Sequence, residues 1–233
     1  MPLLPPQPLH DWHLTPGEAV ALQKRLAPRV ERSDRIAPVR HIAGVDIGFE
    51  DSGATTRAAA VVLKWREAGP PFEVIEQVVY REPTRMPYIP GLLSFRETPA
   101  ALGACARLET TPELVMVDGQ GLAHPRRLGV ASHLGLWLDV PTVGVAKSRL
   151  CGRHAEVGET RGDSVWLEDK GERIGTVLRS RTRVKPLYVS PGHRISQAAA
   201  LEWVKRCLYR TKLPEPTRQA DRLASRRDGP GRR

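Results

Sequence analysis

Residues 42–49 are Ile42-Ala43-Gly44-Val45-Asp46-Ile47-Gly48-Phe49. Side chains alternate between the two faces of a β-strand. One face therefore carries Ala43, Val45, Ile47 and Phe49, and the other carries Gly44, Asp46 and Gly48. We therefore predict a strand over residues 41–49. An acid in the middle of a central strand is costly unless something compensates its charge, so the glycines around Asp46 indicate a site that another group approaches. The alternative is an edge strand whose Asp46 faces water.

The segments that follow this strand extend it into a sheet. Residues 58–65 are apolar, residues 72–81 are rich in Val and Ile, and both come after short connections, so we expect an antiparallel meander of three strands. Residues 113–118 and 142–147 are apolar runs that alternate with helical patterns, which is typical of buried parallel strands. The sequence therefore predicts an α/β protein with a central mixed sheet, three antiparallel strands and then two parallel strands, flanked by helices.

The remaining elements fit one domain over residues 1–233. Thr15 and Pro16 predict a helix start, with Thr15 as the N-cap. Residues 1–14 are expected to form an extended lead-in and residues 228–233 a flexible tail. The predicted helices cover 15–27, 94–108, 125–138, 196–209 and 215–227, and weaker strands are expected near 164–168, 173–179 and 187–190.

Positive charge is concentrated in the second half of the chain. The formal net charge is +10, and residues 1–120 hold 13 Lys and Arg against 15 Asp and Glu, whereas residues 121–233 hold 23 against 11. A basic half indicates a polyanionic partner, most simply nucleic acid. A genome whose base composition favours arginine is the alternative explanation.

Cysteine usage and hydropathy exclude several classes of protein. Cys105, Cys151 and Cys207 form no Cys-x-x-Cys pair, so neither a zinc site nor a disulfide framework is indicated. No apolar run approaches the roughly 20 residues that span a bilayer, and the first residues lack the basic region of a secretory signal. We expect a soluble, cytoplasmic protein with reduced thiols and no membrane partner.

Two acids occupy positions that favour a metal site. Asp118 ends an apolar strand, and ligands in open α/β sheets bind beyond such carboxyl ends, although a simple turn with Gly119 is an equal alternative. If the sheet forms as predicted, Asp46 and Asp118 lie on neighbouring strands, where their charges repel. A divalent cation removes that conflict, and ligation by carboxylate oxygens selects Mg²⁺ or Mn²⁺ over zinc.

Two further acids have ordinary explanations when taken alone. Glu97 follows Ser94 by three residues, which is the spacing of a capping box at a helix start. Asp221 belongs to the predicted last helix, where a solvated face is the default. Only their association with Asp46 and Asp118 would give them a functional meaning.

Five motifs, in order over residues 43–221, resemble those of the endonuclease V family. The resemblance covers nearly the whole chain. The motifs are Ala43-Gly44-Val45-Asp46, Pro87-Tyr88-Ile89-Pro90-Gly91-Leu92-Leu93-Ser94-Phe95-Arg96-Glu97, Val117-Asp118-Gly119-Gln120-Gly121-Leu122-Ala123-His124-Pro125-Arg126-Arg127, Pro141-Thr142-Val143-Gly144-Val145-Ala146-Lys147 and Leu213-Pro214-Glu215-Pro216-Thr217-Arg218.

The resemblance implies an RNase H-like fold and a DNA repair endonuclease that acts beside deaminated bases such as deoxyinosine. The enzyme would hydrolyse the second phosphodiester bond on the 3′ side of the lesion. Asp46 and Asp118 would hold Mg²⁺, for which Mn²⁺ could substitute, and Glu97 would complete the acidic cluster. Lys147 would lie near the scissile phosphate, while Asp221 matches a catalytic position where family members carry Asp or His.

The same resemblance implies a DNA-binding surface around the loop that contains Tyr88. Tyr88 would be a wedge inserted beside the lesion, held rigid by its neighbouring prolines, although a core aromatic in a Pro-rich turn is the alternative. Gln120 stands where relatives often have Asn or His, which leaves the details of base contact open. The residues implied to contact the DNA are Tyr88, Ile89, Pro90, Gly91, Gly119, His124 and Gly129, of which His124 has a structural alternative.

Basic residues of the second half would follow the DNA backbone, which predicts binding that weakens with salt and has little sequence preference. We name Arg126, Arg127, Arg149 and Arg153 as candidates. The partner would be DNA with deaminated bases, bound by a monomer. Three alternatives are an inosine-specific ribonuclease of the same fold, a non-catalytic binding module, which would be expected to have lost its acids, and a transposase or junction resolvase.

Overall fold

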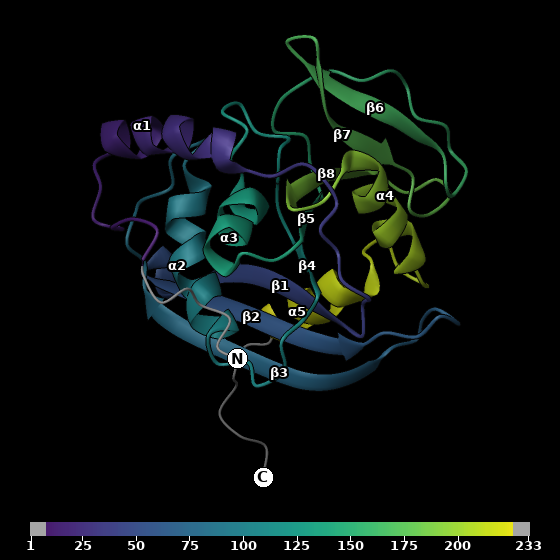
Figure 1. The fold of residues 1–233 in the computed structure, drawn as a ribbon, viewed down its shortest axis with the longest axis horizontal. Helices are drawn as coiled ribbons and strands as arrows, with labels where there is room; N and C mark the ends of the chain where they lie inside the picture. The colour runs from purple at the N-terminus through teal and green to yellow at the C-terminus, as the bar shows by residue number, and fades with distance from the viewer. Residues whose placement is uncertain (1–7, 226–233) are drawn as a thin grey trace.

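The strand predicted over residues 41–49 lies in the middle of a mixed sheet (Figure 1). The computed structural model describes residues 8–225. Within this range eight strands form one sheet in the order β3-β2-β1-β4-β5-β8-β7-β6. The strands are β1 His41–Glu50, β2 Thr55–Lys64, β3 Glu73–Pro83, β4 Leu114–Val117, β5 Thr142–Ala146, β6 Ser164–Asp169, β7 Glu172–Leu178 and β8 Leu187–His193.

The strand directions confirm the predicted fold class. Strands β1, β2 and β3 form an antiparallel meander, and β4 and β5 continue from β1 in parallel. With helices on both faces, this is an RNase H-like arrangement. The three strands predicted as weaker extend the sheet further, because β8 pairs antiparallel with β5, and β7 and β6 follow in turn.

Residues 8–225 form five α-helices, of which α2 to α5 pack on the sheet and α1 packs on α2 and its preceding loop, and most lie close to their predicted ranges. Helix α3 is the exception: it begins five residues after residue 125, because the chain first forms a loop up to Gly129. Two short 3₁₀ turns, Ala27–Arg29 and Asp51–Gly53, accompany the α-helices. The helices are α1 Pro16–Leu26, α2 Leu93–Cys105, α3 Val130–Leu138, α4 Gln197–Arg206 and α5 Glu215–Ala224.

The two helix starts for which we predicted caps differ. At α1, Thr15 caps the helix as expected, and Glu18 closes a reciprocal capping box that was not predicted. At α2, no side chain caps the helix, which begins at Leu93 with Leu92 before it. The capping box suggested for Ser94 and Glu97 is therefore wrong. Its absence leaves the Glu97 carboxylate free to serve elsewhere.

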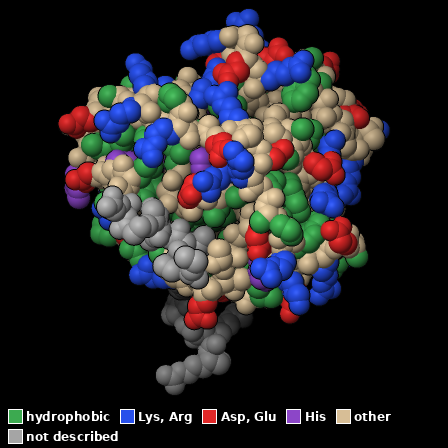
Figure 2. All heavy atoms as spheres, viewed as in Figure 1, with side chains coloured by type: hydrophobic (Ala, Val, Ile, Leu, Met, Phe, Trp, Pro, Cys, Tyr) green, Lys and Arg blue, Asp and Glu red, His purple; other side chains and the backbone are tan. Residues whose placement is uncertain are grey.

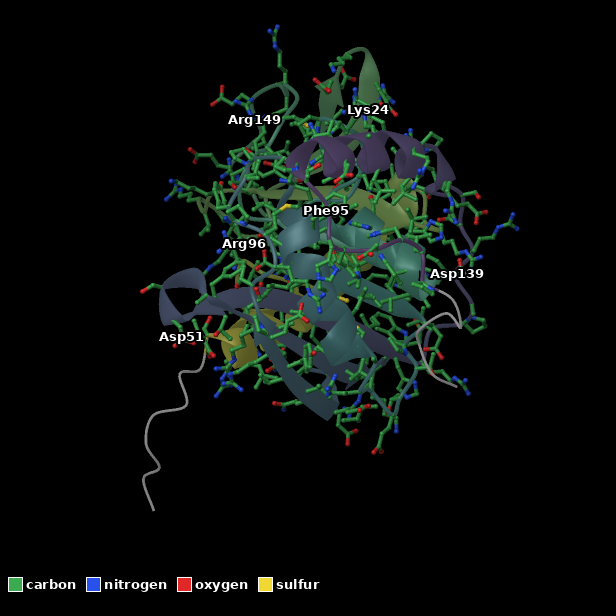
Figure 3. The ribbon with its side chains drawn as sticks, turned by 90° about the vertical axis from the view of Figure 1, so that its left-hand side faces the viewer. Lys24, Asp51, Phe95, Arg96, Asp139 and Arg149 are labelled. Atoms are coloured by element: carbon green, nitrogen blue, oxygen red, sulfur yellow. The ribbon has the colours of Figure 1, made fainter. Side chains whose placement is uncertain are left out.

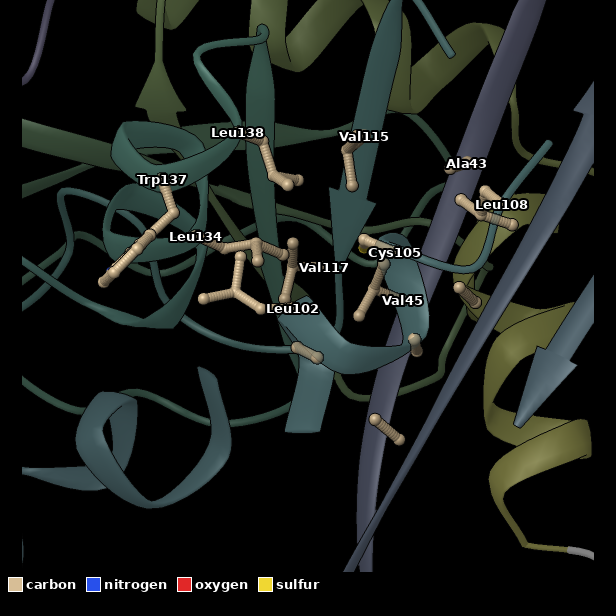
Figure 4. Packing of buried hydrophobic residues seen from close by; sticks show 14 of the residues in the cluster. Ala43, Val45, Leu102, Cys105, Leu108, Val115, Val117, Leu134, Trp137 and Leu138 are labelled. Carbon is tan, nitrogen blue, oxygen red and sulfur yellow. The ribbon is translucent and has the colours of Figure 1, made fainter. Parts of the chain in front are cut away.

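The main core lies between the sheet and helices α2 and α3 (Figure 4). Ala43 and Val45 of β1 point to this side, as strand alternation predicted. Small side chains on β2 and α2 let the helix pack closely on the strands, and Trp137 of α3 belongs to the same core. A second core lies on the opposite face, where Ile42 and Met116 pack under α4.

The glycines beside Asp46 serve a purpose different from the one predicted. A Cβ atom on Gly44 would lie 1.9 Å from the backbone oxygen of Pro216, and one on Gly48 would lie 3.8 Å from that of Ala224. The face of β1 that carries Asp46 is therefore covered by α5, which rests on the glycine backbone. The group that the glycines admit is a helix of the protein itself, and that helix carries Asp221.

The end of the predicted lead-in packs on the protein. Trp12 stacks on Trp137 with ring centroids 5.3 Å apart, and His10 Nε2 lies 2.7 Å from His133 Nε2. Residues 8–14 form neither helix nor strand and bend at residues 9, 10 and 12. The first seven residues of the lead-in and the tail predicted over 228–233 lie outside the described residues. Within residues 8–225 no helix has the length and apolarity required to cross a bilayer.

Candidate active site

Three acids from distant parts of the chain converge beside the middle of β1 and the carboxyl end of β4. Asp46 lies on β1, Asp118 follows β4 directly, and Asp221 lies on α5. One carboxylate oxygen from each lies within 4.8 Å of the others. The predicted proximity of Asp46 and Asp118 is thus confirmed, and Asp221, whose role had been the least defined, completes the group.

Local pairing explains why these side chains meet. Strands β1 and β4 are parallel neighbours with Val45 opposite Val117, and the amide of Asp118 donates a hydrogen bond to the Val45 carbonyl at 2.9 Å. Asp46 and Asp118 are the next residues of their strands. Asp221 reaches them because α5 packs directly on Gly44. The pairing of β1 with β4 therefore positions Asp46 and Asp118, and the docking of α5 on β1 positions Asp221.

Glu97 extends this cluster from the other side. It lies in the first turns of α2, and its carboxylate does not belong to the group of three. Burial raises the pKa of Glu97 to about 8, and the charges of Asp46 and Asp118 contribute to that rise. Sequence reasoning predicted Glu97 as part of the acidic cluster, and the structure brings it close enough to interact electrostatically.

Lys147 neutralises part of the negative charge. It follows β5, and its Nζ lies 2.5 Å from Asp118 Oδ2 and 2.6 Å from Asp221 Oδ1. Burial alone would lower the pKa of Lys147, but the contacts with the two carboxylates raise it above its ordinary value. The side chain therefore stays a charged ammonium group, which lies between the carboxylates of Asp118 and Asp221.

The cluster still holds more negative charge than it can balance. The pKa of Asp46 is raised to about 7, chiefly by burial and also by the charges of Asp118 and Asp221, while Lys147 works against the rise. Burial likewise raises the pKa of Asp118. A divalent cation relieves the repulsion between carboxylates this close, and an all-oxygen donor set suits Mg²⁺ or Mn²⁺. The residues present therefore fit a divalent metal.

We expect Asp46→Asn to stabilise the metal-free protein, and to do so more at high pH. The folded pKa of about 7 exceeds the ordinary 3.8, so the folded state binds a proton that the unfolded state lacks. The free energy of unfolding of the wild type should therefore fall as pH rises from about 4 to about 7. The variant has no carboxyl group at this position, so this contribution to the fall is absent. Urea unfolding in chelator should show a gain of about 1–3 kcal/mol at about pH 8 and little near pH 4.

A gain of the same size at every pH would contradict this interpretation, because an unperturbed Asp46 has no such pH window. Glu202→Gln is the control, since Glu202 is an exposed acid on α4, away from the cluster. That variant also removes one negative charge, but its effect on stability should stay small at every pH.

Two hollows open on either side of the acids. The first, here called the glycine pocket, has a volume of about 310 Å³, and the second, here called the strand-end groove, about 720 Å³. Lys147 lines both, so the acids lie where the two meet. The glycine pocket is formed by Tyr88, Gly91, Leu93, Ser94, Glu97, Asp118, Gly119, Gln120, His124, Gly129, Val130, Ala146, Lys147, Ser148, Arg149 and Leu150.

The strand-end groove runs along the tips of β1 and β2. Its walls combine acids and bases, among them Glu50 in an ion pair with Arg57 at 2.8 Å. Arg149 lines the glycine pocket and Asp51 lines the strand-end groove, and Figure 3 shows both on the same side of the molecule, with Arg96 between them. Asp139 lies on the opposite side (Figure 3). The two hollows thus share one face of the protein.

The loop between β3 and α2 brings an exposed aromatic ring to the glycine pocket. Tyr88 is 67% exposed, so the alternative of a core aromatic is wrong. Its neighbour Ile89 packs against a cluster of apolar side chains between α1 and the start of α2, whereas Pro90 is exposed. Gly91 has φ +79°, a conformation that strongly favours glycine, and it lines the pocket. The loop is therefore anchored below and exposed at its tip.

A family model described as Endonuclease V matches residues 24–222. The chain belongs to the endonuclease V family. An endonuclease V from Azotobacter vinelandii is 56% identical over 224 residues, which cover 96% of this chain and all of that protein. The chain is therefore a nuclease, and its acidic cluster is the site at which a metal ion could bind.

Solved structures of endonuclease V share the fold. The structure from Streptomyces avermitilis is 37% identical with a TM-score of 0.84, covering 91% of this chain and 92% of that one. The structure from Ciona intestinalis, in complex with a 23mer DNA containing an inosine followed by a ribo-adenosine, is 25% identical with a TM-score of 0.75. That alignment covers 91% of this chain and 97% of the Ciona chain.

In this member of the endonuclease V family, His124 supports the loop that carries Tyr88. Its Nδ1 accepts a hydrogen bond from the Arg126 amide at 3.1 Å, and its Nε2 donates to the Gly91 carbonyl at 3.0 Å. Burial lowers the pKa of His124 to about 4, and Arg126 adds to this effect. Both ring nitrogens of the neutral imidazole are therefore engaged with protein groups, and direct contact with DNA stays a prediction.

Gln23 is a supporting residue that sequence reasoning missed. Its Nε2 donates to the same Gly91 carbonyl at 3.0 Å, and its Oε1 accepts from Arg126 Nε at 2.5 Å. The available signal was a glutamine on the otherwise apolar buried face of α1. A fully buried amide needs partners, so its position could have indicated a polar contact with another segment.

The arginines expected along the DNA backbone divide into two pairs. Arg126 is held by Gln23 and by Gly91, while Arg127 forms ion pairs with Asp169 and Glu172. These contacts are internal, so Arg126 and Arg127 are fixed within the protein and are poorly placed to follow a nucleic-acid strand. Arg149 and Arg153 are exposed, and their contact with the DNA backbone stays a prediction.

Proposed function

We propose that the protein is a DNA repair endonuclease that recognises deoxyinosine and hydrolyses the second phosphodiester bond on its 3′ side with Mg²⁺. The observation that carries this proposal is the position of the acids, which lie between a pocket of about 310 Å³ and a longer groove. A base turned out of its strand fits the pocket, and the strand beyond it fits the groove.

Asp46, Asp118 and Asp221 would hold the metal ion, and Mn²⁺ should substitute for Mg²⁺. When bound, such an ion lowers the pKa of a water molecule and screens the charge of the phosphate. Lys147 lines both hollows, which suits an ammonium that stabilises the negative charge developing on a phosphate oxygen between them. Glu97 lines the glycine pocket and borders the acids, so it would complete the catalytic cluster from the side of the base.

Selection of the lesion would begin before any contact in the pocket. A deaminated base pairs weakly, so turning it out of a duplex costs less than extruding a normal base. Gly91, Gly119 and Gly129 line the pocket and leave room for a planar ring. Ile89, Pro90 and Tyr88 would approach the DNA beside the space that the extruded base leaves. These contacts stay proposals about the bound state.

Tyr88→Ala should lower the nicking rate on duplex DNA containing deoxyinosine about tenfold, because the duplex loses a ring that holds the gap open. On single-stranded DNA the effect should be much smaller, since no partner strand has to be separated. Rates on both substrates at saturating Mg²⁺ provide the measurement, and Tyr88→Phe should retain most of the duplex activity. Equal losses on both strands would contradict a wedge role.

A nicking assay tests the function itself. Duplexes that carry deoxyinosine, deoxyuridine, an abasic site or no lesion are incubated with and without Mg²⁺, and the product lengths are measured. We expect cleavage of the deoxyinosine strand one nucleotide beyond the lesion, only with divalent metal. Full activity in excess chelator would overturn the metal-dependent proposal, and equal cutting of the undamaged strand would overturn the lesion specificity.

An inosine-specific ribonuclease is the second candidate. The observation that favours it is the DNA bound in the Ciona relative, whose inosine precedes a ribo-adenosine. Matched strands of DNA, of RNA and of DNA with a single ribonucleotide after the inosine separate the two candidates. Faster cleavage of both ribonucleotide-containing strands than of DNA would favour the ribonuclease.

We also propose that the chain acts as a cytoplasmic monomer and folds as one domain over residues 1–233. All the described strands join one sheet, which supports a single domain. All three cysteines are free thiols, which supports a reducing compartment. Sedimentation of the full-length protein, alone and with DNA, tests the monomer, and a dimer in either state would contradict it.

A further inference from the structure

A third hollow lies apart from the acids, on the outer edge of the sheet. It has a volume of about 570 Å³ and is lined by Arg153, His154, Ala155, Ser164, Val165, Trp166 and Glu168. We call it the β6 hollow. Trp166 on β6 is 42% exposed, although the Arg173 guanidinium lies 4.7 Å from its ring centroid. The hollow therefore presents a large aromatic surface to solvent.

One segment of chain connects the β6 hollow to the active site. Lys147 contacts two of the acids, Arg149 and Leu150 line the glycine pocket, and Arg153 and His154 line the β6 hollow. Only a few residues separate the two hollows along this segment. A strand that leaves the glycine pocket beside Arg149 is thus directed towards Trp166.

The connecting segment is held firmly on the edge of the sheet. Arg153 and Glu168 exchange backbone hydrogen bonds of 2.7 Å and 2.9 Å. Gly152 has φ +80°, and a Cβ atom there would lie 2.8 Å from the Glu168 carbonyl oxygen. The close approach and the backbone conformation both require glycine. The segment therefore presents Arg149 and Arg153 from a fixed backbone.

The charges on this path suit a polyanion. Within residues 8–225, neither Arg149 nor Arg153 forms a side-chain ion pair, whereas Arg127 pairs with Asp169 and Glu172 and Arg126 is hydrogen-bonded to Gln23 and Gly91. Glu168 lies 3.5 Å from Arg173, which balances the one acid in the hollow. Figure 2 shows Lys and Arg side chains at the β6–β7 end of the molecule, among Asp and Glu. A basic path that ends on an aromatic ring is typical of surfaces that bind single strands.

We propose that the β6 hollow binds an unpaired nucleotide of the substrate strand on the 5′ side of the lesion, with its base stacked on Trp166. The inference rests on the proposed function, which puts the lesion in the glycine pocket and the strand 3′ to it in the strand-end groove. The 5′ part of the strand must then leave on the other side of the pocket. Arg149 and Arg153 contact its phosphates on the way to Trp166.

The test measures binding of single-stranded DNA with one deoxyinosine to the full-length protein in chelator, and nicking in Mg²⁺. The 5′ flank is either long, about 15 nucleotides, or short, about three, with a constant 3′ flank. Trp166→Ala should weaken binding of the long-flank strand about five- to tenfold and leave the short-flank strand unchanged. Trp166→Phe should bind the long flank nearly as well as the wild type.

Two further variants sharpen the result. Arg153→Gln should reduce the salt dependence of long-flank binding by about one phosphate contact. Ile75→Ala is the matched control, because Ile75 is an equally exposed apolar residue, 39% exposed, on β3 at the opposite edge of the sheet. It should change binding of neither strand.

Three outcomes would overturn the inference: no loss in Trp166→Ala, an equal loss for long and short 5′ flanks, or a loss that follows the length of the 3′ flank instead. Failure of the proposed function is recognised separately. A protein that never nicks deoxyinosine strands in Mg²⁺ contradicts the function whatever the binding data show. Nicking with no dependence on Trp166 contradicts only the β6 hollow.

Discussion

Asp46→Asn should reduce nicking of deoxyinosine-containing DNA by about a thousandfold or more while DNA binding stays within about twofold, because bound metal supplies several kcal/mol of transition-state stabilisation. An amide matches the carboxylate in shape but carries no charge, so the metal ion would lose one of its three charged ligands. Asp46 is the best of the three for this test, since Lys147 contacts Asp118 and Asp221 and not Asp46. Its replacement therefore leaves those ion pairs in place.

Stability measurements on Asp46→Asn distinguish a lost metal ligand from a misfolded protein. The same variant should unfold later than the wild type in chelator at about pH 8, so lost activity cannot be assigned to lost folding. Rates are measured over a range of Mn²⁺ and Mg²⁺ concentrations, and metal binding is measured by calorimetry. Activity that remains near the wild-type value at saturating metal would show that Asp46 is not required. Glu202→Gln serves again as the charge-matched control and should nick normally.

The strands and the first two acids could be predicted because the signals are local. The alternation in residues 42–49 determines which side chains share a face, and the parallel pairing of β1 with β4 then brings Asp46 beside Asp118. The apolar run in residues 58–63 and the Val- and Ile-rich run in residues 72–79 likewise predict β2 and β3. The same reasoning found the strands β6, β7 and β8 but not their order in the sheet, since pairing partners are not encoded in periodicity.

The rest of the site depends on packing between elements, which local patterns do not specify. Ser94 and Glu97 have the spacing of a capping box, yet Glu97 lies beside the acids, because the loop before α2 fixes where that helix begins. Asp221 had the pattern of a solvated helix face, and only the docking of α5 on β1 gives it partners. Gln23 and Arg126 meet across 103 residues of sequence, a distance that no spacing rule covers.

The docking of α5 leads to the second large effect, which is expected for Gly44→Ala. A Cβ atom at this position would lie 1.9 Å from the Pro216 backbone oxygen, so the helix has to move away from the strand. Overpacking against backbone costs about 2–4 kcal/mol of stability. A shift of about 1 Å at Asp221 would also lower the nicking rate about a hundredfold, because catalytic groups tolerate little displacement. Thermal unfolding and nicking rates measure the two effects on the same preparation.

Gly48→Ala separates this cause from a general intolerance of side chains on β1. Gly48 lies on the same face of the same strand, but its Cβ would lie 3.8 Å from the Ala224 oxygen, an ordinary contact. That variant should retain most of its stability and activity. If both variants behave alike, contact between α5 and the strand is not what positions Asp221. If Gly44→Ala alone loses activity and Mn²⁺ affinity together, the glycine acts through the third acid of the metal site, since it carries no side chain that could act itself.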